Sequence, residues 1–574
     1  MKKKLSTALM ALILFALCLP GFGLAQQRRD GTSNSTRTTT GKVNSPGTST
    51  ARRARVTTPP RTTTAISDDF SEALAVIQEH YIGGNKLDYN DLYKSSITGM
   101  LRSLDPHSNY FDREEFEDML TDQHSEYYGI GASILSYPTG DSVDTYVTAT
   151  FKNSPAAGAG LRFADRIDAV DGVSMHGKSS SDVRDKIRGP RGTHVKLTLT
   201  RAATGQTEVV EIIRNAVSQP SVPDAYFIRP GVGYIDMTRG FNSDTAELLR
   251  EKLEFLHEHG MTSLVLDLRN NPGGLLEQAI LVAREFLPAG QVIMTQKGRG
   301  GVNVYTSNEV TPDRVPLVIL INQYTASASE IVAGAMQDHD RALIVGHTSF
   351  GKGLVQSIIR LESGGGLTLT SAYYYTPSGR LIQRDYSDGS LYNYYKEAFV
   401  TDDHTPEAKP TGPAMRTDTG RAVYGGGGIK PDEAINAEPF TTAQGRLRTP
   451  IFYFARDLAN GRVPGFDNYK VDRAIEYDHV IQPADFPITE DVFQAFKNYV
   501  AKDPTFKSQL AQVDRNRSFI ETQVRFNLAM AAYGIVTSQQ VLMRQDNQVA
   551  KAVDLLPRAR DLAMSAMRAR MTQP

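Results

Sequence analysis

The spacing of apolar side chains divides the chain into stretches of different character. From about Ile66 they recur every three or four residues, which is the period of an amphipathic helix. A second helix is predicted over residues 88–104, a turn over 105–111 and a third helix over 113–120. We therefore expect residues 66–121 to form an N-terminal helical region. Its first apolar stripe consists of Phe70, Leu74, Ile77 and Tyr81.

Residues 122–215 carry short β-like runs in place of the helical period. Strands are predicted over 132–135, 145–150, 195–200 and 208–213, with a short helix over 181–187. Residues 216–435 then alternate between buried-type strands and amphipathic helices, a pattern that favours an α/β core with a parallel or mixed sheet. The strands of this core are predicted over 231–237, 263–268, 315–321 and 342–345, and its helices over 244–258, 276–286 and up to Gln337.

The last stretch, residues 436–574, is predicted to be mostly helical and carries no recognisable chemical motif. Its strongest helical segments are 493–500, 520–533 and 541–556.

The first 25 residues have the pattern of an export signal. Three lysines precede an apolar run from Leu5 to Leu19, and the small residues Gly23 and Ala25 follow. This order predicts a secretory signal peptide over residues 1–25, because the run is short for a membrane span. An uncleaved membrane anchor, or a lipoprotein modified at Cys18, are the alternatives. Residues 26–65 hold 16 Ser/Thr, eight Lys/Arg and one acidic residue, which predicts a disordered basic linker.

Composition narrows the class of protein further. Among 574 residues, 63 Lys and Arg balance 64 Asp and Glu, and the formal net charge is −1. This balance argues against a dedicated nucleic-acid binder. Cys18 is the single cysteine, which excludes a disulfide framework and a cysteine zinc site.

Residues 122–215 contain a set of glycine-rich motifs in a characteristic order. Ser-Pro-Ala-Ala-Gly-Ala-Gly-Leu at 154–161 precedes Asp-Arg-Ile at 165–167 and Val-Asp-Gly at 170–172. In this order the segment resembles a PDZ domain, and residues 128–131 look like its carboxylate-binding loop. A PDZ domain binds a peptide C-terminus through converging backbone N–H groups and adds the peptide to a sheet edge. The peptide-binding residues expected here are Tyr128, Gly129, Ile130, Gly131, Val183 and Ile187.

Three stretches of residue types suited to catalysis, 267–274, 325–337 and 349–356, each follow a predicted strand, where open sheets place active sites. Ser327 lies where a strand gives way to a helix. A hydroxyl there projects outward, and the adjoining N–H groups are free of intrahelical partners. An ordinary helix cap is the structural alternative. Ser329 competes with Ser327 as nucleophile, and Ser329 or Thr325 could be the cap.

Lys352 lies in Phe-Gly-Lys-Gly, next to apolar residues that could bury its amine. Burial disfavours the charged form, so the lysine pKa could fall from about 10.4 toward roughly 7–8. A neutral lysine can accept the serine proton as a general base. Gln356, four residues later, could hold the amine. The spacing of a phosphate-binding loop is absent.

The glycines at 273 and 274 permit close backbone approach after a strand. We expect one of these N–H groups, with Gly273 as the first choice, to form an oxyanion hole with the N–H of Ala328.

Histidine chemistry is not indicated. His107 and His347 show no Ser–His–acid pattern, and Gly-x-Ser-x-Gly is missing. His257 and His259 are two residues apart and cannot share a helix face, and the zinc motif His-Glu-x-x-His is absent. Structural or surface roles are expected for all four.

Taken together, these motifs resemble the carboxyl-terminal processing protease family, also called tail-specific proteases. The resemblance covers about residues 66–435 and rests on several motifs in order. They are Asp105-Pro106-His107-Ser108, the PDZ segment, 267–274, Ser-Ala-Ser-Glu-Ile at 327–331, 350–353 with Gln356, 374–380 and 428–432. It implies Ser327 as nucleophile in preference to Ser329, Lys352 as base, Gln356 as the residue that orients it, and no cofactor.

The resemblance also implies a multidomain α+β fold. Its parts are a crotonase-like α/β protease core over 216–435, a PDZ domain inserted before it in chain order, and helical N- and C-terminal regions. The predicted function is a serine endopeptidase that cleaves C-terminal tails of envelope proteins. Its partners would be proteins or peptides with a free C-terminus, without nucleic acid, and the N-terminal segment would serve export or tether the chain to a membrane. Two alternatives are a non-catalytic PDZ scaffold and a crotonase-like acyl-CoA enzyme, and the export signal argues against the second.

Overall fold

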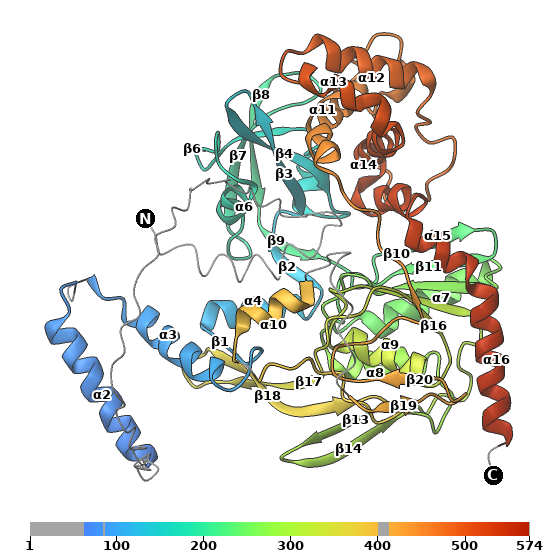
Figure 1. The fold of residues 1–574 in the computed structure, drawn as a ribbon. Coiled ribbons are helices and arrows are strands. Elements are labelled where there is room, and N and C mark those ends of the chain that lie inside the picture. Colours follow the sequence, from blue (N-terminus) through green and yellow to red (C-terminus); the bar gives the residue numbers. More distant parts are fainter. Residues whose placement is uncertain (1–61, 84–85, 388, 400–411, 573–574) are drawn as a thin grey trace, which may run out of the picture. The chain divides into compact units, whose positions relative to one another are not determined.

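A computed structural model describes residues 62–83, 86–387, 389–399 and 412–572 (Figure 1). The predicted signal peptide, Cys18 and the predicted linker up to residue 61 lie outside the described residues. The predicted linker end at residue 65 is wrong, because the Thr62 side chain caps a helix that already begins at Thr63. The described chain forms two compact units, residues 62–103 and residues 104–572. None of the helices in this part of the chain has the length and apolar character needed to cross a bilayer.

The first unit contains the two helices α2 (Thr63–His80) and α3 (Tyr89–Arg102), which confirm the predicted helical periods. Side-chain oxygens of Thr62 and Asp88 accept backbone N–H groups and start the two helices. The apolar side chains of this stripe are exposed except for Leu74, which is half-buried, and Phe70 is 51% exposed.

The centre of the second unit is a six-stranded mixed sheet, as the alternating pattern predicts. The strand at one edge is antiparallel to its neighbour, and the following pairs are all parallel. In sheet order the strands are β10 (Asp224–Arg229), β11 (Val232–Asp236), β12 (Ser263–Asp267), β15 (Leu317–Ile321), β16 (Leu343–Gly346) and β21 (Glu433–Ala434).

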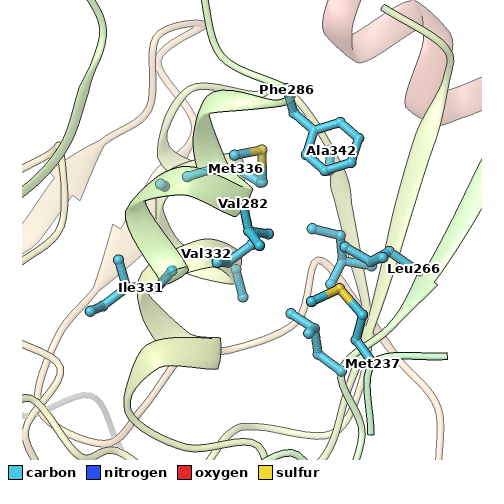
Figure 2. Close-up of a cluster of buried hydrophobic side chains, with 14 of the residues drawn as sticks. Met237, Leu266, Val282, Phe286, Ile331, Val332, Met336 and Ala342 are labelled. Carbon is cyan, nitrogen blue, oxygen red and sulfur yellow. The ribbon is translucent and has the colours of Figure 1, made fainter. Parts of the chain in front are cut away.

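Helices cover both faces of this sheet. On one face, α7 (Thr245–Glu258), α8 (Leu276–Arg284) and α9 (Ala328–Asp338) build a hydrophobic core that includes Leu266 of the sheet and Val332 of α9 (Figure 2). On the other face, Val265 packs in a cluster with residues of α15 (Asn547–Asp554) and α16 (Leu556–Thr572). Successive strand residues point to opposite faces, so β12 is buried throughout, with Leu264, Val265 and Leu266 at its centre.

A second sheet lies beside the catalytic stretches. Its strands are β1 (Asn109–Phe111), β18 (Gly366–Tyr375), β13 (Val292–Gly298) and β14 (Gly301–Thr306), with β17 (Leu354–Arg360) also paired to β18. The segment predicted as a turn over 105–111 therefore ends in a strand, because residues 109–111 pair with β18. Helix α4 (Arg113–Asp122) follows, closed at its start by a capping box between Asp112 and Glu115.

Residues 126–218 form the segment that resembles a PDZ domain. Its antiparallel sheet has the order β3 (Ala132–Thr139), β4 (Ser142–Thr150), β5 (Arg166–Val170), β7 (His194–Thr200) and β8 (Thr207–Ile213), with β6 (Val173–Ser174) paired to β5. Two helices, α5 (Pro155–Gly158) and α6 (Ser180–Ile187), complete it, and β2 (Glu126–Gly129) pairs with β9 (Asn215–Ser218).

The C-terminal region is helical, as predicted, and it contacts two parts of the unit. Its first four helices are α11 (Thr442–Ala459), α12 (Glu490–Lys502), the short α13 (Leu510–Val513) and α14 (Arg517–Met543). These share a hydrophobic core with β3 and β4, whereas α15 and α16 cover the central sheet (Figure 1). Three 3₁₀ turns also belong to this region, Asp467–Tyr469, Lys507–Gln509 and Asp514–Asn516. Before it, the stretch predicted as the core also contains α10 (Leu391–Phe399), β19 (Ala414–Arg416) and β20 (Ala422–Tyr424).

The prediction of one helix over 541–556 is wrong. Helix α14 ends at Met543, and the side chain of Asp546 accepts the N–H groups of Gln548 and Val549. This cap starts a new helix, so the apolar period continues across a break in the backbone.

Candidate active site

Three loops meet at one edge of the central sheet. They follow β12, β15 and β16, which are parallel neighbours, so their carboxyl ends lie together. The Ala326 N–H donates to the Asn271 carbonyl at 3.0 Å, and the Phe350 N–H donates to the Thr325 carbonyl at 2.9 Å. The structure therefore brings the predicted glycine, serine and lysine stretches into contact.

Ser327 occupies an unusual backbone conformation at the start of α9. Its φ is 57° and its ψ −116°, a region that costs a non-glycine residue about 1–3 kcal/mol. The Glu330 carboxylate accepts the Ser327 N–H at 2.8 Å and helps to hold this conformation. The side chain is partly exposed, and its hydroxyl donates no hydrogen bond to the described residues. It is therefore available to another molecule.

The competing hydroxyls are both used inside the protein. Ser329 Oγ donates to the Asn271 carbonyl at 3.1 Å, and Thr325 Oγ1 donates to the Leu268 carbonyl at 2.8 Å. Both side chains are fully buried. They tie the serine loop to the glycine loop and are not presented to a substrate.

Gly273 lies directly against the serine. A Cβ built on Gly273 would be 2.7 Å from the Ser327 Cβ and 2.8 Å from the Ala328 nitrogen, and its φ is +93°. Only glycine fits both constraints. The Ala328 N–H, at the N-terminus of an 11-residue helix, has no partner in the described chain.

The two glycines differ in their hydrogen bonds. The Gly273 N–H donates to Asn271 Oδ1 at 2.9 Å, whereas the Gly274 N–H has no partner within the described ranges. Gly274 thus presents a free donor in this conformation, and Gly273 presents one only if the Asn271 side chain moves.

Lys352 is held by a short chain of hydrogen bonds. Its Nζ donates to Gln356 Oε1 at 2.6 Å, and Gln356 Nε2 donates to the His107 carbonyl at 2.6 Å. Because the lysine amine donates and the His107 carbonyl accepts, the oxygen and the nitrogen of the Gln356 amide can each take only one side. Burial lowers the pKa of Lys352 to about 8, against the attraction of the Asp105 and Glu330 charges. No hydrogen bond joins Lys352 Nζ to Ser327 Oγ among the bonds of the described chain.

Glu330 links the serine loop to the lysine loop, a role that the sequence analysis missed. One oxygen accepts Ser349 Oγ at 2.5 Å and the Gly351 N–H at 2.7 Å. The other accepts the N–H groups of Ser327 at 2.8 Å and Lys352 at 2.9 Å. Complete burial raises the pKa of Glu330 in spite of these bonds. The capping-box spacing Ser-x-x-Glu was the available signal.

The turn at 105–108 contains the His107 carbonyl, which accepts the hydrogen bond from Gln356. Asp105 Oδ1 accepts the N–H groups of His107 and Ser108, both at 2.8 Å. Although burial opposes it, bonds from Ser108 and His107 hold the pKa of Asp105 below its usual range. Burial and the Lys352 charge lower the pKa of His107 to about 3, so its imidazole is neutral, and its Nε2 bonds the Tyr394 hydroxyl at 2.7 Å. This fits the structural role expected for His107.

The other three candidate histidines bond groups other than Ser327 and Lys352. His257 pairs with Asp313, His259 with the Phe255 carbonyl and His347 with the Thr348 carbonyl. Across the described ranges, no group of three His, Cys, Asp or Glu side chains is placed to bind a metal.

The residues predicted to bind a peptide lie around one edge of the PDZ segment. Tyr128 and Gly129 end β2, while Ile130 and Gly131 link it to β3, the edge strand beside which α6 lies. Tyr128 is 37% exposed, but Ile130, Val183 and Ile187 have at most 5% exposure and point into the PDZ core. In this conformation a peptide could reach the backbone of the loop and of the edge strand β3. The role of the buried side chains in peptide binding stays a prediction.

The family model for Peptidase family S41 matches residues 231–389, and the PDZ domain model matches 146–201. A carboxy-terminal-processing protease of Bartonella bacilliformis is 39% identical over 303 residues, which cover 52% of this chain and 68% of that protein.

The chain belongs to the carboxyl-terminal processing protease family. A second member, from Synechocystis sp., is 36% identical over 314 residues, covering 54% of this chain and 72% of its own length. Among solved structures, a photosystem II D1 C-terminal processing protease has 29% identity and a TM-score of 0.30, over 54% of this chain and 88% of that one.

Membership makes this protease a serine-type peptidase with an S41 core, a PDZ domain and a mixed helical and sheet structure. It favours the peptidase over the scaffold and the acyl-CoA enzyme among the functions considered. The PDZ domain supports binding of peptide or protein C-termini.

Proposed function

We propose that this processing protease cleaves C-terminal tails with Ser327 as nucleophile and Lys352 as general base. The observation that carries this proposal is the Lys352 amine, which burial brings to a pKa of about 8 and which Gln356 holds at 2.6 Å. A lysine with that pKa is partly neutral near pH 7 and can accept a proton. The hydroxyl of Ser327, on the neighbouring loop, is the proton's source.

The reaction proceeds in two halves. Ser327 Oγ attacks the peptide carbonyl while Lys352 takes its proton, and the oxyanion is held by the Ala328 N–H with the N–H of Gly273 or Gly274. Lys352 then protonates the leaving amine as the C–N bond breaks. Water attacks the acyl-enzyme while Lys352 accepts its proton. Lys352 then gives that proton to Ser327 Oγ as the acyl C–O bond breaks, which restores the hydroxyl, and the carboxylic acid product ionises and leaves.

Substrate capture is assigned to the PDZ domain. The carboxylate of the tail would bind at the Tyr128–Gly131 loop, and the tail would add as a strand to the free edge of β3 beside α6. We expect the apolar tails of envelope proteins as substrates, since the predicted export signal places the enzyme outside the cytoplasm. The core would be crotonase-like, and the first 25 residues would be cleaved or would tether the chain to a membrane.

The test is cleavage of an unfolded protein with an apolar C-terminus by residues 26–574. Wild type is compared with Ser327→Ala, and an otherwise identical substrate carries a C-terminal amide. We expect cleavage by wild type, none by the variant and slower cleavage of the amide. An active Ser327→Ala enzyme would refute the nucleophile, and equal rates on both substrates would refute capture of the carboxylate.

A further inference from the structure

The C-terminal helical region reaches the glycine loop through one buried arginine. Arg269 is the second residue after β12, four residues before Gly273. Its Nη1 donates to Asp546 Oδ2 and to Gln548 Oε1, both at 2.8 Å. The two acceptors lie 277 and 279 residues further along the chain, at the start of α15.

The other two guanidinium nitrogens of Arg269 bind Asp267, the last residue of strand β12. Its Nε and Nη2 donate to the Asp267 carboxylate at 2.7–3.1 Å. Burial works against the charge of Arg269, but the Asp267 and Asp546 carboxylates hold its pKa well above the usual range. Nη1 is therefore the part of this buried cation that depends on α15, and a buried charged donor left without an acceptor is costly.

Hydrogen bonds hold the residues between Arg269 and the two glycines in place. The Asn270 N–H donates to Asn322 Oδ1 at 2.9 Å, in a left-handed conformation with φ of 61°. The next residue, Asn271, accepts Ala326 N–H on its carbonyl and Gly273 N–H on its side chain, at 3.0 and 2.9 Å. A shift of the Arg269 backbone is therefore passed on to the loop that faces Ser327.

We propose that Asp546 and Gln548 are positioning residues for the oxyanion hole, acting through Arg269. The C-terminal region is then part of the catalytic apparatus in addition to its packing role. This inference rests on the proposed function of Ser327, Ala328 and the two glycines.

Asp546→Asn is the sharpest test, because Asp546 has two separate tasks. Its Oδ1 caps α15 by accepting the N–H groups of Gln548 and Val549 at 2.8 and 3.0 Å, while its Oδ2 accepts from Arg269. Asparagine is as good a cap as aspartate, so the helix start is kept. Its amide NH₂ then faces the Arg269 Nη1 donor. A double variant, Asp546→Asn with Gln548→Met, removes the second acceptor.

Arg558→Gln is the matched control. Arg558 joins α16 to Glu433 of the same sheet at 2.8 Å, and its side chain is 56% exposed. Exposed ion pairs contribute little to stability. Arg558→Gln therefore removes a contact between the C-terminal helical region and the central sheet without touching the glycine loop.

The assay measures kcat and KM on a short peptide and on a protein with a free apolar C-terminus. It also measures the inhibition constant of a peptide aldehyde, whose adduct places an oxyanion in the hole. We expect kcat of Asp546→Asn to fall about tenfold on both substrates, and further in the double variant, since oxyanion geometry controls the chemical step. Aldehyde affinity should fall in parallel, with KM within twofold and the thermal midpoint nearly unchanged.

Unchanged kcat and aldehyde affinity in a folded Asp546→Asn enzyme would overturn the inference, as would an equal loss in Arg558→Gln. If the double variant does not fold, the single variant decides. An inactive wild type, or an active Ser327→Ala enzyme, would instead remove the proposed function, so the two failures are distinguishable.

Discussion

At the scale of single residues, two polar groups define the chemistry available at neutral pH. The hydroxyl of Ser327 donates no hydrogen bond within the described chain and sits on a strained backbone. The amine of Lys352 has one hydrogen-bond acceptor, Gln356, and a pKa lowered to about 8. A free hydroxyl and a partly neutral amine on adjoining loops are what a serine–lysine peptidase requires.

Activity should therefore depend on pH through Lys352. Only the neutral amine accepts a proton, and it forms as pH rises through the pKa. We expect kcat/KM on a short peptide to increase from pH 6 and to level off above about pH 8. The measurement is a pH–rate profile between pH 6 and 10, made within the range where circular dichroism shows the fold intact. A profile that is flat or that falls over this range would contradict a lysine base.

Glu330→Gln should damage both activity and stability. Each carboxylate oxygen of Glu330 accepts two hydrogen bonds, so an amide in either orientation turns an NH₂ toward two donors. We expect the free energy of unfolding to fall by at least about 2 kcal/mol, and kcat to fall at least about tenfold because both loops lose their common anchor. Chemical unfolding and steady-state kinetics measure the two effects. Wild-type values in both would show that Glu330 is not the link between the loops.

The sequence was informative about residues that act directly and less so about those that act through others. Ser327, Lys352 and Gln356 stand in motifs at strand ends, where chemistry is expected. Glu330 was visible only as part of a capping box. Asp546 carries no motif, because its partner Arg269 lies 277 residues away and only the tertiary fold brings them together.

At the scale of elements, the site is a junction between a glycine loop and the N-terminus of α9. The predicted order of strands and helices placed the three loops at one sheet edge correctly, since parallel strands end on the same side. Two local departures were not predictable from periodicity. Residues 109–111 become a strand because β18 offers a partner, and the C-terminal helix breaks at Asp546 because a side-chain cap interrupts a continuing apolar period.

Gly273→Ala tests the close approach of the glycine loop to the N-terminus of α9. The added methyl would lie 2.7 Å from the Ser327 Cβ and from the Ala326 carbonyl oxygen, in a backbone conformation that favours glycine. The loop must move away from α9, which separates the glycine donors from the Ala328 N–H. We expect kcat to fall by roughly 100-fold or more, measured on a short peptide. Wild-type turnover in this variant would show that the loop is not part of the oxyanion hole.

At the scale of the whole molecule, the C-terminal helical region connects the other parts of the second unit. Its first helices share one hydrophobic core with the PDZ sheet, and its last two cover the sheet that carries the active site. Helical periodicity predicted the region, but not its two docking faces. These depend on pairs such as Tyr137 and Phe452, which are too far apart in sequence for any local pattern to indicate.

Phe452→Ala should destabilise the hydrophobic core that the PDZ domain shares with the C-terminal helices. The Phe452 ring stacks on Tyr137 with centroids 3.8 Å apart, and the side chain is fully buried. Truncation of such a side chain costs about 3–5 kcal/mol. Since the chain has no tryptophan, urea unfolding is followed by circular dichroism. Val209→Ala, at a position 65% exposed in the same PDZ domain, is the control. Equal midpoints for both variants would contradict a shared core.

The central claim is that Lys352 activates Ser327, and covalent labelling tests it most directly. A fluorophosphonate reacts with an activated serine hydroxyl, and mass spectrometry of the peptide 315–341 separates Ser327 from Ser329. The account predicts one adduct, on Ser327, formed by wild type and lost in Lys352→Ala. An adduct on Ser329, or equal labelling of Ser327 in the Lys352→Ala enzyme, would contradict it.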